Sequence, residues 1–249
     1  MRITGGEFGG RNLKVPKSDA IRPTQDRVRE ALFNIIQCEV PGCDFLDLFA
    51  GSGAVGLEAL SRGAKSVTFV EANRRHLAVL NENLTSLGSG RVGVGSGRVS
   101  VGSGRVGLGS GRVGVGSGRD GVGADGVCVG AARLKRLERT LGDSTVVLSD
   151  CYRWIATYSG SGFSIGFADP PYALGEEKGY AAVLATLAER GVIRPGGLFI
   201  AEMTAVQKAE ETPGWELIRD RTYGKTRLCL WRRLASPVAR PHQCLQSNV

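Results

Sequence analysis

The chain has 249 residues, of which 42% are hydrophobic and 22% charged, and its formal net charge is +8. This length is sufficient for one or two domains with a hydrophobic core. The sequence contains no run of about 18 apolar residues, which is the length that would predict a membrane span. The pI near 9.4 favours a polyanionic partner, nucleic acid first.

The cysteines and histidines do not have the spacing of a metal site. The six cysteines are scattered without a C-x-x-C pair, and only His76 and His242 are available as further soft ligands. We expect reduced, mostly buried thiols and no metal. The first residues, Met1 to Gly6, lack an apolar signal region, so we expect a cytoplasmic protein, and we expect it to act as a monomer.

Residues 1–40 are predicted to form an extension before the main domain. Glycine turns within residues 1–20 indicate a small β-hairpin. Thr24 is predicted to cap a helix whose apolar stripe comprises Val28, Leu32, Ile35 and Ile36. Basic side chains lie on or beside its first turns, where they form either a solvated face or a contact with phosphate or cofactor: Arg22, Arg27 and Arg29.

A glycine-rich loop follows the first core strand. The apolar run 45–48 contains Asp47 and leads into Gly51-Ser-Gly53-Ala-Val-Gly56 and a helix-forming sequence. Glycines let the backbone approach a ligand, and the free N–H groups of the helix point to the same place. The loop fits the dinucleotide fingerprint, with Glu71 twenty residues past Gly51. Asp47, however, suits the cationic amino-acid end of S-adenosylmethionine better than a diphosphate. A methyltransferase, a dinucleotide enzyme and a structural turn all remain open at this point.

The next elements predict a parallel sheet. A helix over residues 54–62, a β-rich strand over 66–70 ending in Glu71, and a helix over 73–87 follow in order. Alternating strands and helices imply right-handed crossover connections.

Residues 88–130 consist of a glycine-rich unit that repeats every seven residues. Three glycines in a unit cannot sustain a helix, so the period does not indicate a coiled coil. We predict a flexible surface insert, with RNA contact by its arginines and a β-solenoid as alternatives.

Order is predicted to return with a basic helix over residues 131–141. Strands follow over 145–148, 163–168 and 198–202, with helices over 152–158 and 177–190 between them. A hairpin pairs residues 215–218 with 227–231, and the tail, 234–249, is predicted to be disordered.

A second motif, Asp169-Pro170-Pro171-Tyr172, comes directly after a predicted parallel strand, where open α/β sheets place their ligands. The two prolines remove two N–H donors, so carbonyls and a carboxylate remain as acceptors for an amino group. Tyr172 offers a flat face for a base withdrawn from its stack. An amine held in this way can be presented in line to a methyl sulfonium. The bland alternative is a rigid turn.

The two motifs together resemble those of class I S-adenosylmethionine-dependent methyltransferases that act on exocyclic amines of nucleobases. The pieces I-T-G-G, R-P-T-Q-D-R-V-R-E-A-L-F-N and Y-G-K-T-R narrow the resemblance to bacterial 16S rRNA (guanine-N2)-methyltransferases of the RsmD kind. The resemblance covers about residues 2–87 and 143–233, and the repeat is the departure from the family pattern.

The resemblance implies roles for individual residues. The methionine part of S-adenosylmethionine would be held by Asp47, Ala50, Gly51 and Gly53. Glu71 would accept both ribose hydroxyls, and Asp150 would take the adenine amino group beside the Cys151 backbone. The target guanine would be oriented by Asp169, Pro170, Pro171 and Tyr172, with Arg22, Thr24 and Arg27 closing over cofactor or nucleotide. Cations that could grip rRNA phosphates are Arg219, Arg221, Lys225 and Arg227.

The expected fold is a Rossmann-like class I methyltransferase, a mostly parallel twisted sheet with helices on both faces, a C-terminal antiparallel hairpin and a small N-terminal β-hairpin extension. Residues 41–233 would form its domain, interrupted by 88–130. The expected substrate is 16S rRNA, within the small ribosomal subunit or an assembly intermediate. Alternatives are a DNA adenine-N6 or cytosine-N4 amino-methyltransferase, which predicts a larger target-recognition domain, and a non-catalytic RNA-binding module, which predicts eroded motifs.

Overall fold

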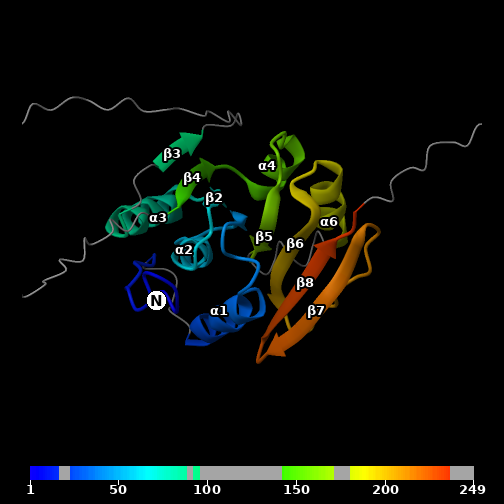
Figure 1. Cartoon of the computed structure of the whole chain (residues 1–249), viewed down its shortest axis with the longest axis horizontal. Helices are drawn as coiled ribbons and strands as arrows, with labels where there is room; N and C mark the ends of the chain where they lie inside the picture. Colours follow the sequence, from blue (N-terminus) through cyan, green and yellow to red (C-terminus); the bar gives the residue numbers. More distant parts are fainter. Residues whose placement is uncertain (17–22, 89–91, 96–141, 171–179, 236–249) are drawn as a thin grey trace, which may run out of the picture. The chain divides into compact units, whose positions relative to one another are not determined.

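The computed structural model describes residues 1–16, 23–88, 92–95, 142–170 and 180–235; of residues 23–25 and 92–95 it describes the backbone alone. Its elements, in chain order, are α1 (Pro23–Ile35), β1 (Asp44–Leu48), α2 (Ala54–Ser61), β2 (Ser66–Glu71), α3 (Arg74–Ser86), β3 (Val92–Gly95), β4 (Asp143–Leu148), α4 (Cys151–Thr157), β5 (Phe163–Ala168), α6 (Tyr180–Glu189), β6 (Ile193–Thr204), β7 (Trp215–Tyr223) and β8 (Thr226–Arg233) (Figure 1).

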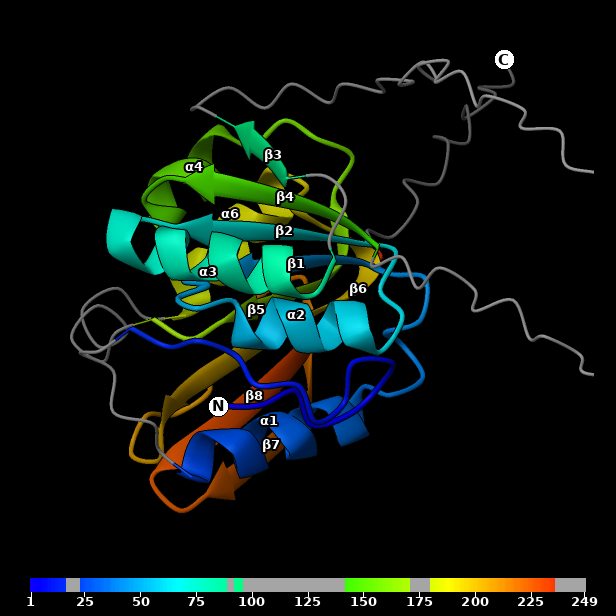
Figure 2. The same ribbon diagram turned by 90° about the vertical axis from the view of Figure 1, so that its left-hand side faces the viewer.

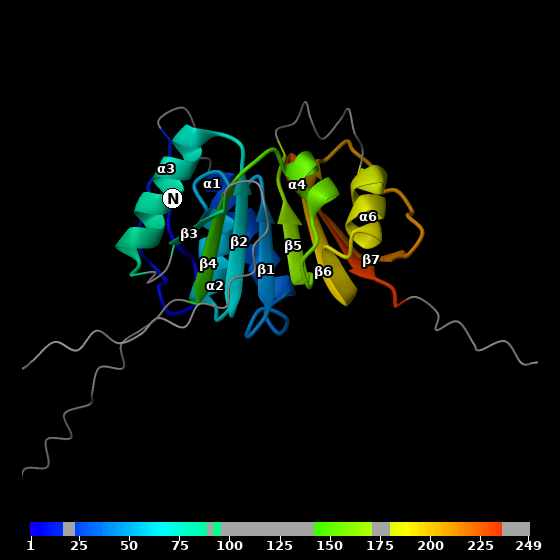
Figure 3. The ribbon, with the colours of Figure 1, turned by 90° about the horizontal axis from the view of Figure 1, so that it is seen from above.

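The strands form one sheet in the order β3-β4-β2-β1-β5-β6-β8-β7. The neighbouring strands from β3 through β4, β2, β1 and β5 to β6 are parallel, whereas β8 pairs antiparallel with both β6 and β7. Figure 3 shows β4, β2, β1, β5 and β6 side by side in this order. The central strands are short and mostly apolar because both of their faces are covered. Four of the five residues of β1, for example, are buried.

Helices cover both faces of the sheet, as predicted. On one face, α1, α2 and α3 contribute Leu32, Leu57 and Leu80 to a cluster that includes Phe45 and Phe69 from the strands. On the other face, α4 and α6 contribute a second set of buried side chains, among them Trp154, Ile155, Leu184 and Leu187. Figure 2 shows α2 and α3 on the near side of the strands and α6 behind them. The alternation of side chains along each strand supplies both cores.

The N-terminal extension shares the core of the first face, to which Ile3, Phe8 and Leu13 contribute buried side chains. Its chain reverses direction as predicted, because the N–H of Ile3 donates to the carbonyl of Arg11 at 2.9 Å and the N–H of Leu13 to that of Met1 at 2.9 Å. Only one isolated antiparallel bridge, Arg2 with Asn12, forms within the described residues, so the expected hairpin is a turn-rich loop and not a pair of strands.

Two further expectations need correction. The structure starts α1 at Pro23, so Thr24 is the second residue of the helix and not its N-cap; proline suits the first helical position because its missing N–H needs no partner there. Four residues of the predicted insert, Val92–Gly95, form the edge strand β3 beside β4, where an unpaired strand edge accepts another chain segment.

Several sequence predictions lie outside the described residues. They concern most of the insert, the basic helix over 131–141 and the C-terminal tail from residue 236. Within the described part of the chain, no helix is both long enough and apolar enough to cross a bilayer.

Candidate functional site

The candidate site lies where the order of strands reverses. From β1 the chain proceeds outward to β2 and β4, then returns to place β5 on the other side of β1. Ligands of open α/β sheets bind at such a switch point, beyond the carboxyl ends of the strands. Asp47 pairs in register with Phe167, and Asp169 directly follows the last residue of β5, so both predicted acids lie at this switch point.

The loop between β1 and α2 has the conformation that its glycines predict. Gly51 and Gly53 have φ angles of 55° and 82°, in the left-handed region that disfavours other residues. Gly56 serves a different purpose, because a Cβ at this position would lie 2.3 Å from the Phe69 ring and would push α2 away from β2. Phe49 also has a positive φ, 59°, although it is not a glycine. Such a residue is strained and persists only where its surroundings hold it, typically at functional sites.

Asp47 is a buried carboxylate that also anchors α2. Its side chain is 2% exposed, and Oδ2 accepts the backbone N–H of Gly56 at 2.8 Å. Burial raises the pKa of Asp47 to about 7, and the negative charges of Glu71 and Asp169 add to this effect, while the Gly56 hydrogen bond opposes it. A cation that bound beside Asp47 would stabilise its charged form.

Glu71 ends β2 and connects it to the glycine-rich loop. Oε2 accepts the N–H of Gly51 at 2.8 Å, and Oε1 accepts the N–H of Asn73 at 2.7 Å. Glu71 is buried, with 7% of the residue exposed. The two hydrogen bonds fix the carboxylate at the loop, which is where the sequence predicts a ribose.

Asp150 and Cys151 follow β4 and lie near the ends of β1 and β2. Asp150 is exposed and caps α4 by accepting the N–H of Arg153 at 2.9 Å. The buried thiol of Cys151 accepts the N–H of Phe49 at 3.3 Å and lies 3.7 Å from the carbonyl oxygen of Val70. The ends of β1, β2 and β4 therefore converge, as the predicted cofactor site requires. Burial raises the pKa of Cys151 to about 12, so its thiol is neutral.

A cleft of about 200 Å³ opens at this end of the sheet. Asp47, Ala50, Gly51 and Asp169 are among its lining residues, so the structure brings together members of both sequence motifs. Asp169 is exposed and Pro170 buried. Pro171 and Tyr172, the other half of the predicted catalytic motif, lie outside the described residues, as does Arg22, and the side chain of Thr24 is not described.

The cleft also contains residues that lie outside the two sequence motifs. Phe49 lines it beside the loop, and Glu202 lines it from β6. Arg29, expected either on a solvated face or in contact with phosphate or cofactor, is only 5% exposed, and it lines the cleft while pairing with Asp26 and Glu58. The sequence of α1 already indicates that Arg29 is buried. Arg29 comes directly after Val28 and three residues before Leu32, a spacing that places it on the apolar face of the helix.

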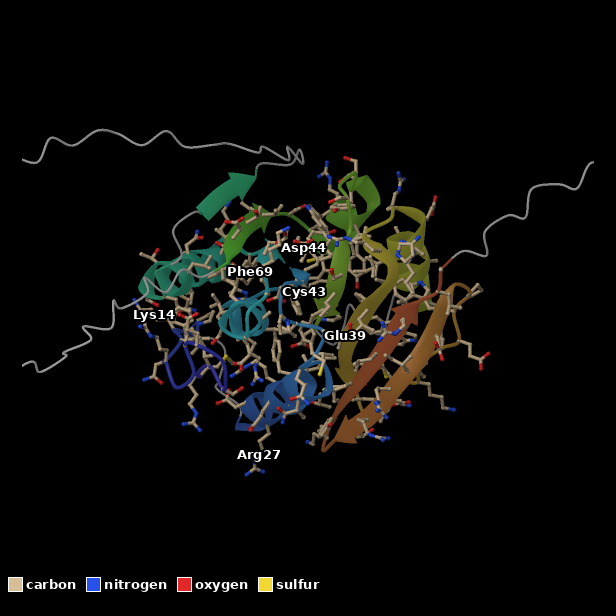
Figure 4. All side chains as sticks on the ribbon, in the orientation of Figure 1. Lys14, Arg27, Glu39, Cys43, Asp44 and Phe69 are labelled. Carbon is tan, nitrogen blue, oxygen red and sulfur yellow. The ribbon has the colours of Figure 1, made fainter. Side chains whose placement is uncertain are left out.

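The predicted RNA-binding cations differ in their surroundings. Arg27 is exposed and projects away from the sheet (Figure 4), and it is not among the residues lining the cleft. Lys225 is exposed at the β7–β8 turn. Arg227 pairs with Asp220, with Nε donating to Oδ1 at 2.7 Å, and this pairing raises its pKa. Arg219 and Arg221 are exposed on β7. Their contact with RNA stays a prediction.

Two other kinds of site, disulfides and metal centres, would involve the cysteines. The described cysteines are free thiols, and Cys43, Cys151 and Cys229 are buried while Cys38 is exposed. Among the residues that the structure describes, no group of three or more His, Cys, Asp or Glu side chains is placed to hold a metal ion.

The strand order and the acid-lined switch point define a class I methyltransferase fold. Solved structures agree: a putative methyltransferase, yhhF from Escherichia coli, is 28% identical with a TM-score of 0.66, over 94% of this chain and 98% of that one. The putative methyltransferase SMU.776, solved with SAH, shares the fold at 15% identity and a TM-score of 0.52, over 85% of this chain and 50% of its own.

The family model described as "Conserved hypothetical protein 95" matches residues 1–98 and 132–232, and the chain belongs to this family. The chain is 50% identical to ribosomal RNA small subunit methyltransferase D of Escherichia coli (strain K12) over 90 residues, which are 36% of the chain. It is 47% identical over 87 residues to the protein of that name from Haemophilus influenzae. The predicted RsmD-like resemblance is thereby confirmed. In these matches the chain spans slightly less than half the length of the curated relatives, 46% and 45%.

Proposed function

We propose that this chain transfers a methyl group from S-adenosylmethionine to the exocyclic N2 amine of a guanine in 16S rRNA, within the small ribosomal subunit or an assembly intermediate. The observation that carries the proposal is the shared cleft of Asp47 and Asp169, which unites the glycine-rich loop with the acid of the Asp-Pro-Pro-Tyr motif. The family membership and the names of the relatives support rRNA methylation, and SMU.776 is a protein of this fold that binds SAH.

The residues present fit S-adenosylmethionine. Asp47 would face its cationic amino group, and the backbone at Gly51 leaves room, because a Cβ there would meet no atom closer than 4.0 Å. Glu71, held by two backbone N–H groups, would accept the ribose hydroxyls, and Asp150 would accept the adenine amino group. The bound cofactor supplies an activated methyl group on a sulfonium.

Asp169 would act on the target base. Its carboxylate follows β5 at the switch point and would accept an N–H of the guanine amine, while the carbonyl of Pro170 would accept the other. Holding both hydrogens fixes the amine nitrogen in line with the methyl group, so positioning and electrostatics supply the rate gain.

The test is methyl transfer from labelled S-adenosylmethionine to 30S subunits purified from cells that lack the enzyme, followed by nucleoside analysis. Wild-type protein should produce N2-methylguanosine. Asp169→Asn should lower the rate by about 100-fold or more, because an amide cannot stabilise positive charge developing on the amine. Asp143→Asn is the matched control, since this aspartate is exposed at the opposite end of a strand.

Cofactor binding, measured separately by calorimetry, distinguishes the parts of the proposal. Binding with methylation of DNA and not of 30S subunits would overturn the substrate and favour a DNA amino-methyltransferase. Binding without methylation of either nucleic acid would favour a non-catalytic RNA-binding module. If no cofactor bound, the assignment of the glycine-rich loop would fail.

A further inference from the structure

A second carboxylate lies next to Asp169 in the cleft. Strands β5 and β6 are parallel neighbours with Ala168 opposite Ala201, so Asp169 and Glu202 follow at adjacent positions. Neighbouring strands lie about 4.8 Å apart. Phe167 and Ile200 precede these acids by two residues and belong to the core beneath α1 and α2, so the strand alternation directs both acids to that side. Both residues line the cleft.

Glu202 is held by a hydrogen bond and by the charge of a neighbouring side chain. The Thr226 hydroxyl from β8 donates to its carboxylate, and Arg29 acts on it through its positive charge. The Arg29 guanidinium itself contacts Asp26 at 3.0 Å and Glu58 at 3.4 Å. Tyr180 donates to the Glu202 backbone carbonyl at 3.0 Å, which fixes the backbone of β6 at this residue.

Ionisation of Glu202 is unfavourable in these surroundings. Burial raises the pKa of Glu202 to about 8, and the charge of Asp169 adds to that effect, while Thr226 and Arg29 oppose it. Perturbed carboxyl groups in a cleft are typical of functional sites. A ligand edge with two neighbouring hydrogen-bond donors could bind both carboxylates, and its contact with Glu202 would favour the ionised form of that residue.

Guanine has such an edge, because its N1–H and its N2 amine are adjacent donors. Adenine and cytosine have an unprotonated ring nitrogen beside their exocyclic amine, and its lone pair would face a carboxylate unfavourably. We propose that Glu202 accepts the guanine N1–H while Asp169 accepts the N2 amine, so that Glu202 selects guanine over other amino-bearing bases. This inference rests on the proposed function and adds the residue that reads the base.

The test uses 16S rRNA with a single substitution at the nucleotide that the wild-type enzyme modifies. Ligation introduces either guanine or 2,6-diaminopurine there, and the RNA is reconstituted into 30S subunits. 2,6-Diaminopurine keeps the amine at C2 but has a lone pair at N1. Wild-type enzyme should prefer guanine in kcat/KM by about ten- to a hundredfold, the range of one good base-edge contact.

The variant Glu202→Gln keeps the size of the side chain and an acceptor for Thr226, but its amide can donate to the N1 lone pair. The preference for guanine should fall about tenfold or more, with part of the change coming from faster methylation of 2,6-diaminopurine. Cofactor affinity should stay within about twofold, since Glu202 would touch only the base. Glu216→Gln, an exposed glutamate on β7, should retain the wild-type preference.

A merely structural role for Glu202 would lower the activity on both substrates equally and leave their ratio unchanged, which would overturn the inference. Loss of folding in Glu202→Gln is checked by its melting curve, and Thr226→Val then provides a second variant, for which a smaller fall in the ratio is expected. An unchanged ratio in Thr226→Val would in that case contradict the inference. Wild-type protein that fails to methylate guanine would instead overturn the proposed function itself.

Discussion

Asp47 combines two requirements that conflict in the absence of ligand. Its carboxylate caps α2 through Gly56 and lies in a cleft with other acids, so ionisation is unfavourable until a cation arrives. In the unfolded chain the same group ionises near 3.8. The unfolded state therefore releases its proton first, and the free energy of unfolding falls as pH rises from about 4 to about 7.

Asp47→Asn should remove this penalty while weakening cofactor binding. At pH 8 the ligand-free variant should melt a few degrees above the wild type, because the amide oxygen still accepts the Gly56 N–H and carries no charge. Its affinity for S-adenosylmethionine should fall about ten- to a hundredfold, the loss expected for a charge-assisted contact. Scanning fluorimetry and calorimetry measure the two effects.

The pH dependence of binding provides the control for Asp47. Wild-type affinity for S-adenosylmethionine should increase as pH rises through about 7 and then level off, because the ionised form binds the ammonium group. In Asp47→Asn this rise should be absent. A rise of equal size in both proteins would assign the titration to another group.

At the scale of elements, Glu58 joins α2 to α1 and to the N-terminal segment. It is fully buried, accepts the N–H groups of Thr4 at 2.7 Å and Gly5 at 2.8 Å, and pairs with Arg62 at 2.8 Å and Arg29 at 3.4 Å. Arg29 lines the cleft, so this cluster also holds one wall of the candidate site.

Glu58→Gln should destabilise the protein by about 3–5 kcal/mol, because two arginines lose their buried counter-charge. Urea unfolding measures the change, and hydrogen exchange should report faster exchange in residues 3–5. The control is Glu82→Gln, which breaks the exposed pair with Lys14 and should change stability by less than about 1 kcal/mol. Equal effects of the two variants would show that Glu58 is not a structural anchor.

At the scale of the whole molecule, the predicted insert interrupts the part of the sequence that the family shares. The family model matches residues 1–98 and 132–232 and leaves out the residues between them. All of the residues that line the cleft lie within the ranges that the family model matches.

Replacing Val101–Arg139 with a short Gly/Ser linker should therefore leave the melting temperature within about 3 °C and cofactor affinity within about twofold, since long surface insertions change loop-closure free energy only slightly. The same deletion shows whether the repeat contributes to RNA affinity, measured with 30S subunits at two salt concentrations. A variant that fails to fold or to bind cofactor would show that residues 101–139 are needed for the fold or for the cofactor site.

The agreement between sequence and structure is good where the evidence is local. The apolar runs predict β1, β2 and β5, and the turn residues predict the glycine-rich loop, because periodicity and backbone preference act within a few residues. Asp47, Glu71 and Asp169 lie just before, at and just after the end of a strand, and parallel strands place such positions at one edge of the sheet. The RsmD-like resemblance depends in addition on the pieces I-T-G-G, R-P-T-Q-D-R-V-R-E-A-L-F-N and Y-G-K-T-R.

Long-range pairing decided the rest. The acid in Ile200-Ala-Glu202 reads as one residue of a strand, and only the register of β6 with β5 places it beside Asp169. The positive φ of Phe49 depends on packing around the loop, and the burial of Arg29 depends on Glu58, a residue of another helix. The sequence by itself thus determined the fold class and the acids at strand ends, since these depend on local pattern. The neighbours of each acid were decided by the tertiary structure alone, because strand register and helix packing join residues far apart in the chain.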